Sequence, residues 1–159
     1  MEKFNYKPTK PKDASTLIII RKNKKKTFVL MGQRPMQSRF MPGVYVFPGG
    51  VTEKEDLQAY KFFKLKPNKQ VNKKAVKSYS NSHCQSLLLT AIRETAEETG
   101  LYLAAADKSS SKPFINSGSS WNHFTKKSYV PSINKLLFFG RAITPSRLKI
   151  RFHARFFLA

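Results

Sequence analysis

The sequence predicts a single α/β domain, in which short apolar strands are interleaved with one long amphipathic helix. The chain has 159 residues, enough for one compact domain with a substantial core. Runs of apolar, β-branched and aromatic residues at 15–20, 27–31 and 136–143 are typical of strands. Residues 83–99 instead place their apolar side chains at helical spacing. These two periodicities in one short chain favour the α/β class.

The first half of the chain is expected to contain mostly strands and turns. Residues 1–13 are polar and rich in lysine, and we expect a flexible basic arm before a domain over residues 14–159. Strands over 15–20 and 27–31 would be joined by a basic turn. A short buried strand over 44–47 would be broken sharply by Pro48-Gly49-Gly50, whose glycines allow the backbone to approach a ligand or metal closely.

The middle of the chain predicts a helix, a long polar loop and a second, longer helix. A short helix over 57–65 and a mobile Lys-, Asn- and Ser-rich loop over 66–82 together form an insertion at about 57–82. Asn81 or Ser82 is expected to cap the helix over 83–99, and Gly100 is expected to end it. The elements expected after it are a strand over 101–105, a short helix over 121–129, and strands over 136–143 and 153–159.

One face of the long helix carries three glutamates. At about 100° per residue, Glu94, Glu97 and Glu98 share a face, and the apolar side chains occupy the opposite one. Like charges three and four residues apart repel on a helix. A divalent cation would turn that repulsion into attraction, and carboxylate oxygens are the ligands that Mg²⁺ prefers. Arg93 lies four residues before Glu97, where its guanidinium could orient a carboxylate.

Composition argues against the alternative that these acids form an ordinary solvated helix face. The chain has nine acids against 30 lysines and arginines, and three of the nine acids stand on one helix face. The net charge of +21 implies attraction to polyanions such as nucleic acid, acidic membranes or phosphorylated small molecules. The lone Cys84 excludes an internal disulfide, and no apolar run approaches a transmembrane length. We therefore expect a cytoplasmic protein with no membrane partner.

The residues from Pro48 to Leu101 resemble the Nudix box. That family's pattern is Gly-x5-Glu-x7-Arg-Glu-apolar-x-Glu-Glu-x-Gly-apolar, and its second half matches Arg93 to Leu101, with Thr95 at an apolar position. Asp56 stands at the spacing of the first glutamate. The Lys-rich run then replaces the seven-residue spacer. Asp56 is therefore a weak candidate for the box's first acid, and the alternative is that the insertion moves it away.

A long insertion inside the box is a feature of a Nudix subgroup related to peroxisomal coenzyme A diphosphatases. The stretches 41–50, 91–94, 142–145 and 155–159 resemble that subgroup. The resemblance covers nearly the whole chain and implies a Nudix-type α/β/α sandwich around a mixed sheet. It also implies further strands and a closing helix after residue 159, so the fold is expected to be incomplete at the C-terminus.

The resemblance implies hydrolysis of a nucleoside diphosphate linked to another group, such as coenzyme A or a derivative. Mg²⁺ or Mn²⁺ would be the cofactor, neutralising the diphosphate and lowering the pKa of a bound water. Glu97 and Glu98 are assigned as metal ligands, and Glu94 as a ligand or general base. The carbonyl of Gly49 would complete the coordination, and Arg93 would orient Glu97 or a neighbouring carboxylate.

Other side chains have two possible interpretations, a role in substrate binding or a purely structural role. Arg34 and Arg39 are candidates to pair with substrate phosphates, with surface arginine as an equal alternative. The aromatic residues Tyr45, Phe47 and Trp121 are expected in the core rather than stacked on a base.

Two other functional hypotheses compete with the hydrolase. A basic binding protein on the same scaffold would contact nucleic acid through non-specific charge, with affinity falling steeply as salt rises. Such binding would persist without Mg²⁺ and survive mutation of the glutamates. The third hypothesis is an inactive fragment whose missing C-terminal part supplied an acid or a substrate wall.

Overall fold

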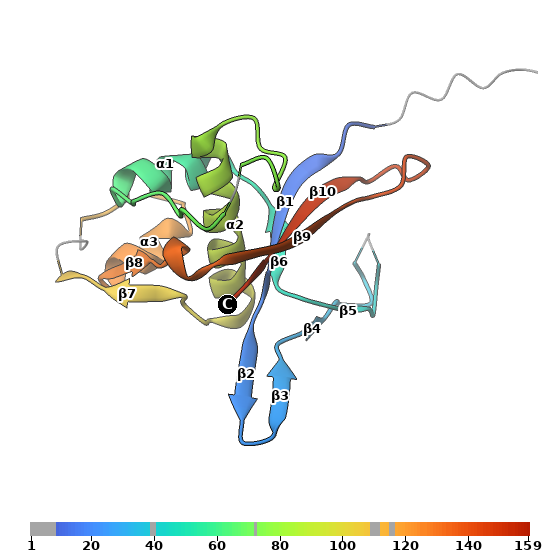
Figure 1. Cartoon of the computed structure of the whole chain (residues 1–159), viewed down its shortest axis with the longest axis horizontal. Helices are drawn as coiled ribbons and strands as arrows, with labels where there is room; N and C mark the ends of the chain where they lie inside the picture. Colours follow the sequence, from blue (N-terminus) through green and yellow to red (C-terminus); the bar gives the residue numbers. More distant parts are fainter. Residues whose placement is uncertain (1–8, 39–40, 72, 109–111, 115–116) are drawn as a thin grey trace, which may run out of the picture.

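A four-stranded mixed sheet forms the centre of the protein (Figure 1). The computed structural model describes residues 9–38, 41–71, 73–108, 112–114 and 117–159. The strands lie in the order β6 (Gly49–Val51), β1 (Lys12–Ile18), β10 (Phe152–Leu158) and β9 (Leu137–Ile143). β1 runs parallel to β10, while β6 and β9 pair antiparallel with their neighbours. The predicted mixed sheet is confirmed.

The expected basic arm over 1–13 is partly wrong at its end. β1 begins at Lys12, because Lys12 and Asp13 pair with Phe152 and His153 of β10. The first eight residues of the expected arm lie outside the described residues.

Helix α2 (Asn81–Thr99) packs against the sheet and organises the core. Every residue from 83 to 93 is buried, and Leu87, Leu88 and Ile92 are completely inaccessible. Ser80, one residue before the predicted caps, is the N-cap, and its side chain accepts from the backbone N–H of His83. Gly100 ends the helix as predicted, with a φ of 71° that glycine adopts without strain. In the described residues the helices lie on one side of the sheet (Figure 1).

Smaller elements surround this centre. β2 (Ile20–Asn23) and β3 (Lys26–Val29) form a hairpin that projects away from the sheet (Figure 1). The other elements are β4 (Gly32–Gln33) paired with β5 (Tyr45–Val46), β7 (Ala104–Ala106) paired with β8 (Tyr129–Pro131), α1 (Lys54–Phe62), α3 (Trp121–Lys126) and the 3₁₀ helix η2 (Ile133–Lys135).

The segment around the glycine pair differs from the prediction. The strand expected to be buried over 44–47 is short, and Tyr45 is 62% exposed because β5 pairs only with β4, away from the main sheet. The preceding strand β5 ends at Val46, before Pro48, so the predicted break is confirmed. Gly49 and Gly50 then belong to a new strand, β6, because their backbones pair with Thr16 and Ser15 of β1.

Several described residues of the Lys-rich insertion, which was predicted to be a mobile loop after its helix, pack against the core. Its helix α1 starts three residues earlier than predicted and lies against α2. In the run that follows, Asn68, Val71 and Val76 are buried. Asn68 Nδ2 donates to the carbonyls of Ile133 and Leu136, at 2.6 and 2.8 Å. A few buried side chains therefore fix a segment whose composition is otherwise typical of a loop.

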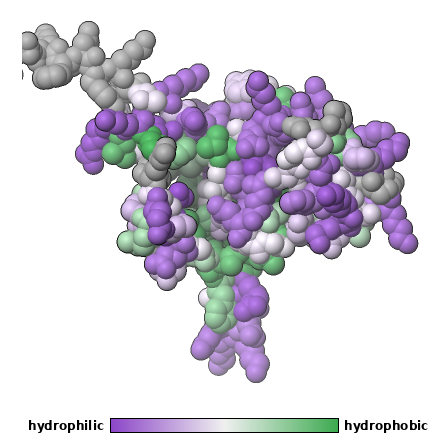
Figure 2. Space-filling view, turned by 180° about the vertical axis from the view of Figure 1, so that it is seen from behind, coloured by the Kyte–Doolittle hydropathy of each residue, from purple (hydrophilic) through white to green (hydrophobic). Residues whose placement is uncertain are grey.

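The surface is strongly hydrophilic. Hydrophilic residues spread over most of the face in Figure 2 instead of forming one stripe, and hydrophobic residues gather near the base of the projecting hairpin. Among the described residues, no helix has both the length and the apolar character needed to cross a membrane.

Candidate active site

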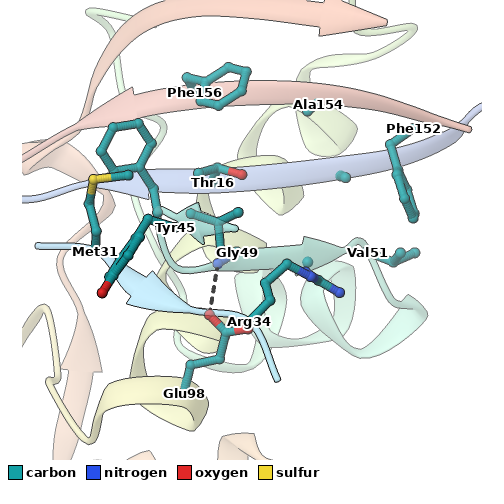
Figure 3. A pocket seen from close by; sticks show the side chains of 14 residues that line it. Thr16, Met31, Arg34, Tyr45, Gly49, Val51, Glu98, Phe152, Ala154 and Phe156 are labelled. Atoms are coloured by element: carbon teal, nitrogen blue, oxygen red, sulfur yellow. Dashed lines mark hydrogen bonds between the residues drawn. The ribbon is translucent and has the colours of Figure 1, made fainter. Parts of the chain in front are cut away.

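The site forms where the C-terminal half of α2 passes the glycine pair of β6. A Cβ atom added to Gly50 would lie 2.4 Å from the carboxylate of Glu94, so only a residue without a side chain fits there. The backbone N–H of Gly49 donates to Glu98 Oε2 at 3.1 Å (Figure 3). Two of the three predicted glutamates therefore lie against the Pro-Gly-Gly segment. This bond uses the N–H of Gly49, so it leaves the predicted role of the Gly49 carbonyl as a metal ligand a prediction.

The buried guanidinium of Arg93 connects acidic residues of the site. Its side chain is only 3% exposed. Nη1 donates to Glu94 Oε1 at 3.0 Å and lies 3.2 Å from Glu97 Oε2. Nη2 donates to the carbonyl of Val51 on β6. One buried guanidinium thus ties two of the acids to each other and the helix to the edge strand.

Asp56 completes this arrangement, and of the two alternatives the structure supports the one in which the insertion does not move it away from the helix. Asp56 is completely buried in the first turn of α1. Its carboxylate faces Arg93 and two further side chains, and the donors to it are Arg93 Nε and Nη2, Thr90 Oγ1, Trp121 Nε1 and the N–H of Glu53. Asp56 therefore lies against Arg93 of the motif, because α1 packs along α2. Trp121 is a core residue, as predicted.

Burial and mutual repulsion perturb the acids. Burial, with repulsion from Glu97 and Glu98, raises the pKa of Glu94 to about 7, although Arg93 partly offsets this. Burial also raises the pKa of Glu98, against the opposing effects of the Gly49 N–H and of Arg34. A carboxylate with a pKa near neutrality can accept or release a proton under physiological conditions.

The donor set has the chemistry of a hard-cation site, although its side chains are not arranged around a common point. Within the described residues, no group of three acids or other ligand side chains stands in metal-binding geometry. Glu97 instead contacts Arg93, and Glu98 accepts from Gly49. The chemistry nevertheless fits a divalent cation, because burial and then repulsion from Glu97 and Glu98 raise the pKa of Glu94, and a bound cation would stabilise its charged form.

An apolar cavity of about 540 Å³ adjoins these acids (Figure 3). It lies over the face of the sheet that α2 does not cover, and its lining includes Glu98, Arg34, Tyr45, Ala154, Phe152 and Phe156. The Nε atom of Arg34 is buried and has no hydrogen-bond partner. An unpaired guanidinium N–H beside a cavity is a ready donor for an anionic ligand. Arg39, the other predicted phosphate contact, lies outside the described residues.

Sequence reasoning missed the cavity walls. Tyr45 was expected in the core but lines the cavity. Phe152, Ala154 and Phe156 alternate along β10, so that a small residue stands between two rings on one face. That period of two was the available signal, but the sequence does not show which face of the strand is left open.

A known protein structure resembles the fold of this chain. No family model and no curated protein matches the chain. A solved structure, the Nudix hydrolase from Alicyclobacillus acidocaldarius, superposes with a TM-score of 0.73 and is 27% identical. The alignment covers 95% of this chain and 70% of that one. The chain has the Nudix hydrolase fold. This likeness supports an enzyme of the Nudix hydrolase type.

Proposed function

We propose that this Nudix-fold protein is a divalent-metal-dependent hydrolase of a diphosphate that links a nucleoside to another group. The observation that carries the proposal is the placement of Glu94 and Glu98 against Gly50 and Gly49, with Arg93 buried beneath them. On a solvent-exposed helix, repulsion between these carboxylates would move their side chains apart. Here β6, Arg93 and Asp56 hold them together, at the expense of a raised pKa.

Glu94, Glu97, Glu98 and the backbone of Gly49 are the groups that would hold Mg²⁺ or Mn²⁺. When bound, such an ion neutralises diphosphate charge and promotes ionisation of water. Arg93 keeps Glu94 and Glu97 in fixed orientations through Nη1. Glu94 serves as a ligand or as the general base. In the second role its Oε2 would take the proton, because Oε1 already accepts from Arg93.

The cavity supports a substrate that combines negative charge with an apolar or flat group. The unpaired Nε–H of Arg34 is available to donate to a phosphate in the part of the cavity that Glu98 also lines. Phe152 and Phe156 flank the small Ala154 on the sheet face, which leaves room for a ring or an acyl chain between them (Figure 3). Coenzyme A and its derivatives carry both kinds of group and are therefore proposed for the first substrate panel.

The proposal is tested by incubating the protein with a panel of nucleotide-linked diphosphates, with and without Mg²⁺, and measuring release of nucleoside monophosphate. We expect metal-dependent turnover that Glu97→Gln and Glu98→Gln each abolish. Glu55→Gln, on α1, removes the same charge outside the site and should leave turnover unchanged. Turnover that persists in both site variants would refute the assignment of these acids.

A further inference from the structure

A second hollow lies at the opposite end of α2 from the glutamates. Its volume is about 480 Å³, and it is lined mostly by basic and aromatic residues: Lys73, Lys74, Lys77, Tyr79, His83 and Arg155. Glu94, the nearest of the three glutamates along the helix, follows His83 by 11 positions, which corresponds to about 17 Å along its axis. The hollow is therefore separate from the proposed hydrolase site.

Tyr79 forms a rigid platform at this hollow. Its ring stacks on His83 with centroids 3.8 Å apart and an angle of 17° between the planes. The His83 ring is itself fixed, because Nδ1 contacts Ser78 Oγ at 2.9 Å and Nε2 lies 3.2 Å from Asp13 Oδ2. Tyr79 nevertheless remains 77% exposed, so the stack covers one face of its ring and leaves surface free. A fixed, exposed ring can stack with the base of a nucleotide.

Lysines stand on both sides of this platform. Lys73 and Lys77 line the first hollow, and an adjoining hollow of about 510 Å³ shares Tyr79 and adds Lys12 and Lys54. Two acids are nearby, but both have internal partners. Asp13 pairs with Arg155 and His83, and the Glu53 side chain caps the first turn of α1. The two linings together hold five lysines and Arg155 against these two acids, so the local charge is positive and attracts phosphate.

The segment that carries the lysines is fastened to the sheet. Arg155, only 1% exposed, donates from Nε to the carbonyl of Val76 at 3.0 Å and from Nη2 to that of Lys77 at 3.3 Å. The same guanidinium pairs with Asp13 on the neighbouring strand. Because the backbone at Val76 and Lys77, beside Tyr79, is held before any ligand arrives, less conformational entropy is lost on binding.

We propose that the Tyr79 surface, made of Tyr79 with Lys73, Lys77, Lys12 and Lys54, binds single-stranded nucleic acid. One base would stack on Tyr79, and the phosphates before and after it would contact the two lysine pairs. A strand carries phosphate on both sides of each base, which matches lysines on both sides of the ring better than a free nucleotide does. The net charge of +21 would further favour a polyanion.

The role of the ring is tested by fluorescence anisotropy with a labelled 12-nucleotide single strand in buffer without divalent metal. We expect Tyr79→Ala to weaken binding by between about fivefold and 150-fold. Tyr79→Phe keeps the ring and should bind like the unmodified protein. Phe139→Ala removes a ring that is 70% exposed on β9 and should have no effect. Equal losses in Tyr79→Ala and Phe139→Ala would overturn the proposal.

The role of the lysines is tested by the salt dependence of the same binding. The double variant Lys73→Gln/Lys77→Gln should reduce the slope of log affinity against log salt by about 1.4, the value for two phosphate contacts. The matched control, Lys24→Gln/Lys25→Gln, removes the same charge from the exposed turn of the β2–β3 hairpin. Equal slopes in the two double variants would show attraction to the overall charge alone and refute a defined site.

A competition experiment distinguishes a strand from a free nucleotide. Adenosine monophosphate should displace the labelled strand only at concentrations far above those of an unlabelled 12-mer. Displacement at equal concentrations of nucleotide would show that the surface binds free nucleotides, contrary to the proposal. These measurements do not depend on hydrolysis, so failure of the Tyr79 surface and failure of the proposed active site give different results.

Discussion

Replacing Asp56 by asparagine should destabilise the protein strongly, because it removes the counter-charge of a buried arginine. Both partners are almost inaccessible, with side-chain exposures of 0% for Asp56 and 3% for Arg93. Asparagine is nearly the same size, but one of its two terminal groups is a donor that would face Arg93, Thr90 or Trp121, which are donors themselves. Breaking a buried pair by removing one partner costs about 3–5 kcal/mol. That is a large part of the roughly 5–15 kcal/mol that stabilises an ordinary domain.

Urea denaturation followed by tryptophan fluorescence measures this loss, because Trp121 is the only tryptophan and contacts Asp56. A loss of about 4 kcal/mol corresponds to a fall in Tm of about 8–16 °C for a domain of this size. Lys25→Gln changes a charged side chain in the exposed turn of the β2–β3 hairpin and should shift stability by less than about 0.5 kcal/mol. A loss below about 1 kcal/mol for Asp56→Asn would show that Arg93 is held by other contacts and that this reasoning is wrong.

Three further perturbations test the site and the insertion. Gly50→Ala should lower activity and stability, since its Cβ would lie 2.4 Å from Glu94, whereas Gly140→Ala has open space and should be tolerated in the same turnover and melting assays. In buffer with a chelator, the free energy of unfolding should fall as pH rises from 4.5 to about 7, because the raised pKa of Glu94 means that the folded form binds the proton more tightly than the unfolded form. The fall should be at most about 3 kcal/mol. Urea titrations at several pH values should show a flatter profile for Glu94→Gln. Asn68→Ala should cost about 1–3 kcal/mol by leaving buried carbonyls unpaired, while the exposed Asn134→Ala should cost little, as thermal melts would show.

The parts of the site that were predictable are those fixed by local periodicity. Glu94, Glu97 and Glu98 share a helix face because of their spacing alone, and the sequence also placed Arg93 within reach of Glu97. The structure agrees that these side chains lie on one side of α2. It adds that Glu94 and Glu98 reach the backbone of β6, which no local pattern encodes.

The errors come from residues whose environment is set by distant partners. The glycines of Pro48-Gly49-Gly50 locally favour a turn, but pairing with β1 overrides that preference and makes them a strand. Tyr45 stands in a short apolar run that is typical of a buried strand, yet β5 pairs outside the main sheet and leaves Tyr45 exposed. The loop over 66–82 was predicted to be mobile from its average polarity, which hides the few side chains, such as Asn68 and Val76, that bind it to the core.

The position of the insertion explains how it can interrupt the motif without displacing the acids. Asp56 keeps the motif's spacing from Gly50, and its side chain accepts from the N–H of Glu53 in the capping box that starts α1, so it is fixed before the insertion continues. The extra residues then lengthen only the path from Asp56 to Arg93. Because the entropy of closing a loop grows with the logarithm of its length, a roughly fivefold longer connection costs only about 1.5 kcal/mol. The buried Asp56–Arg93 pair closes that connection. A cost of this size is small beside the roughly 5–15 kcal/mol that stabilises an ordinary domain. The segment between the two partners can therefore carry other residues, including Lys73, Lys77 and Tyr79.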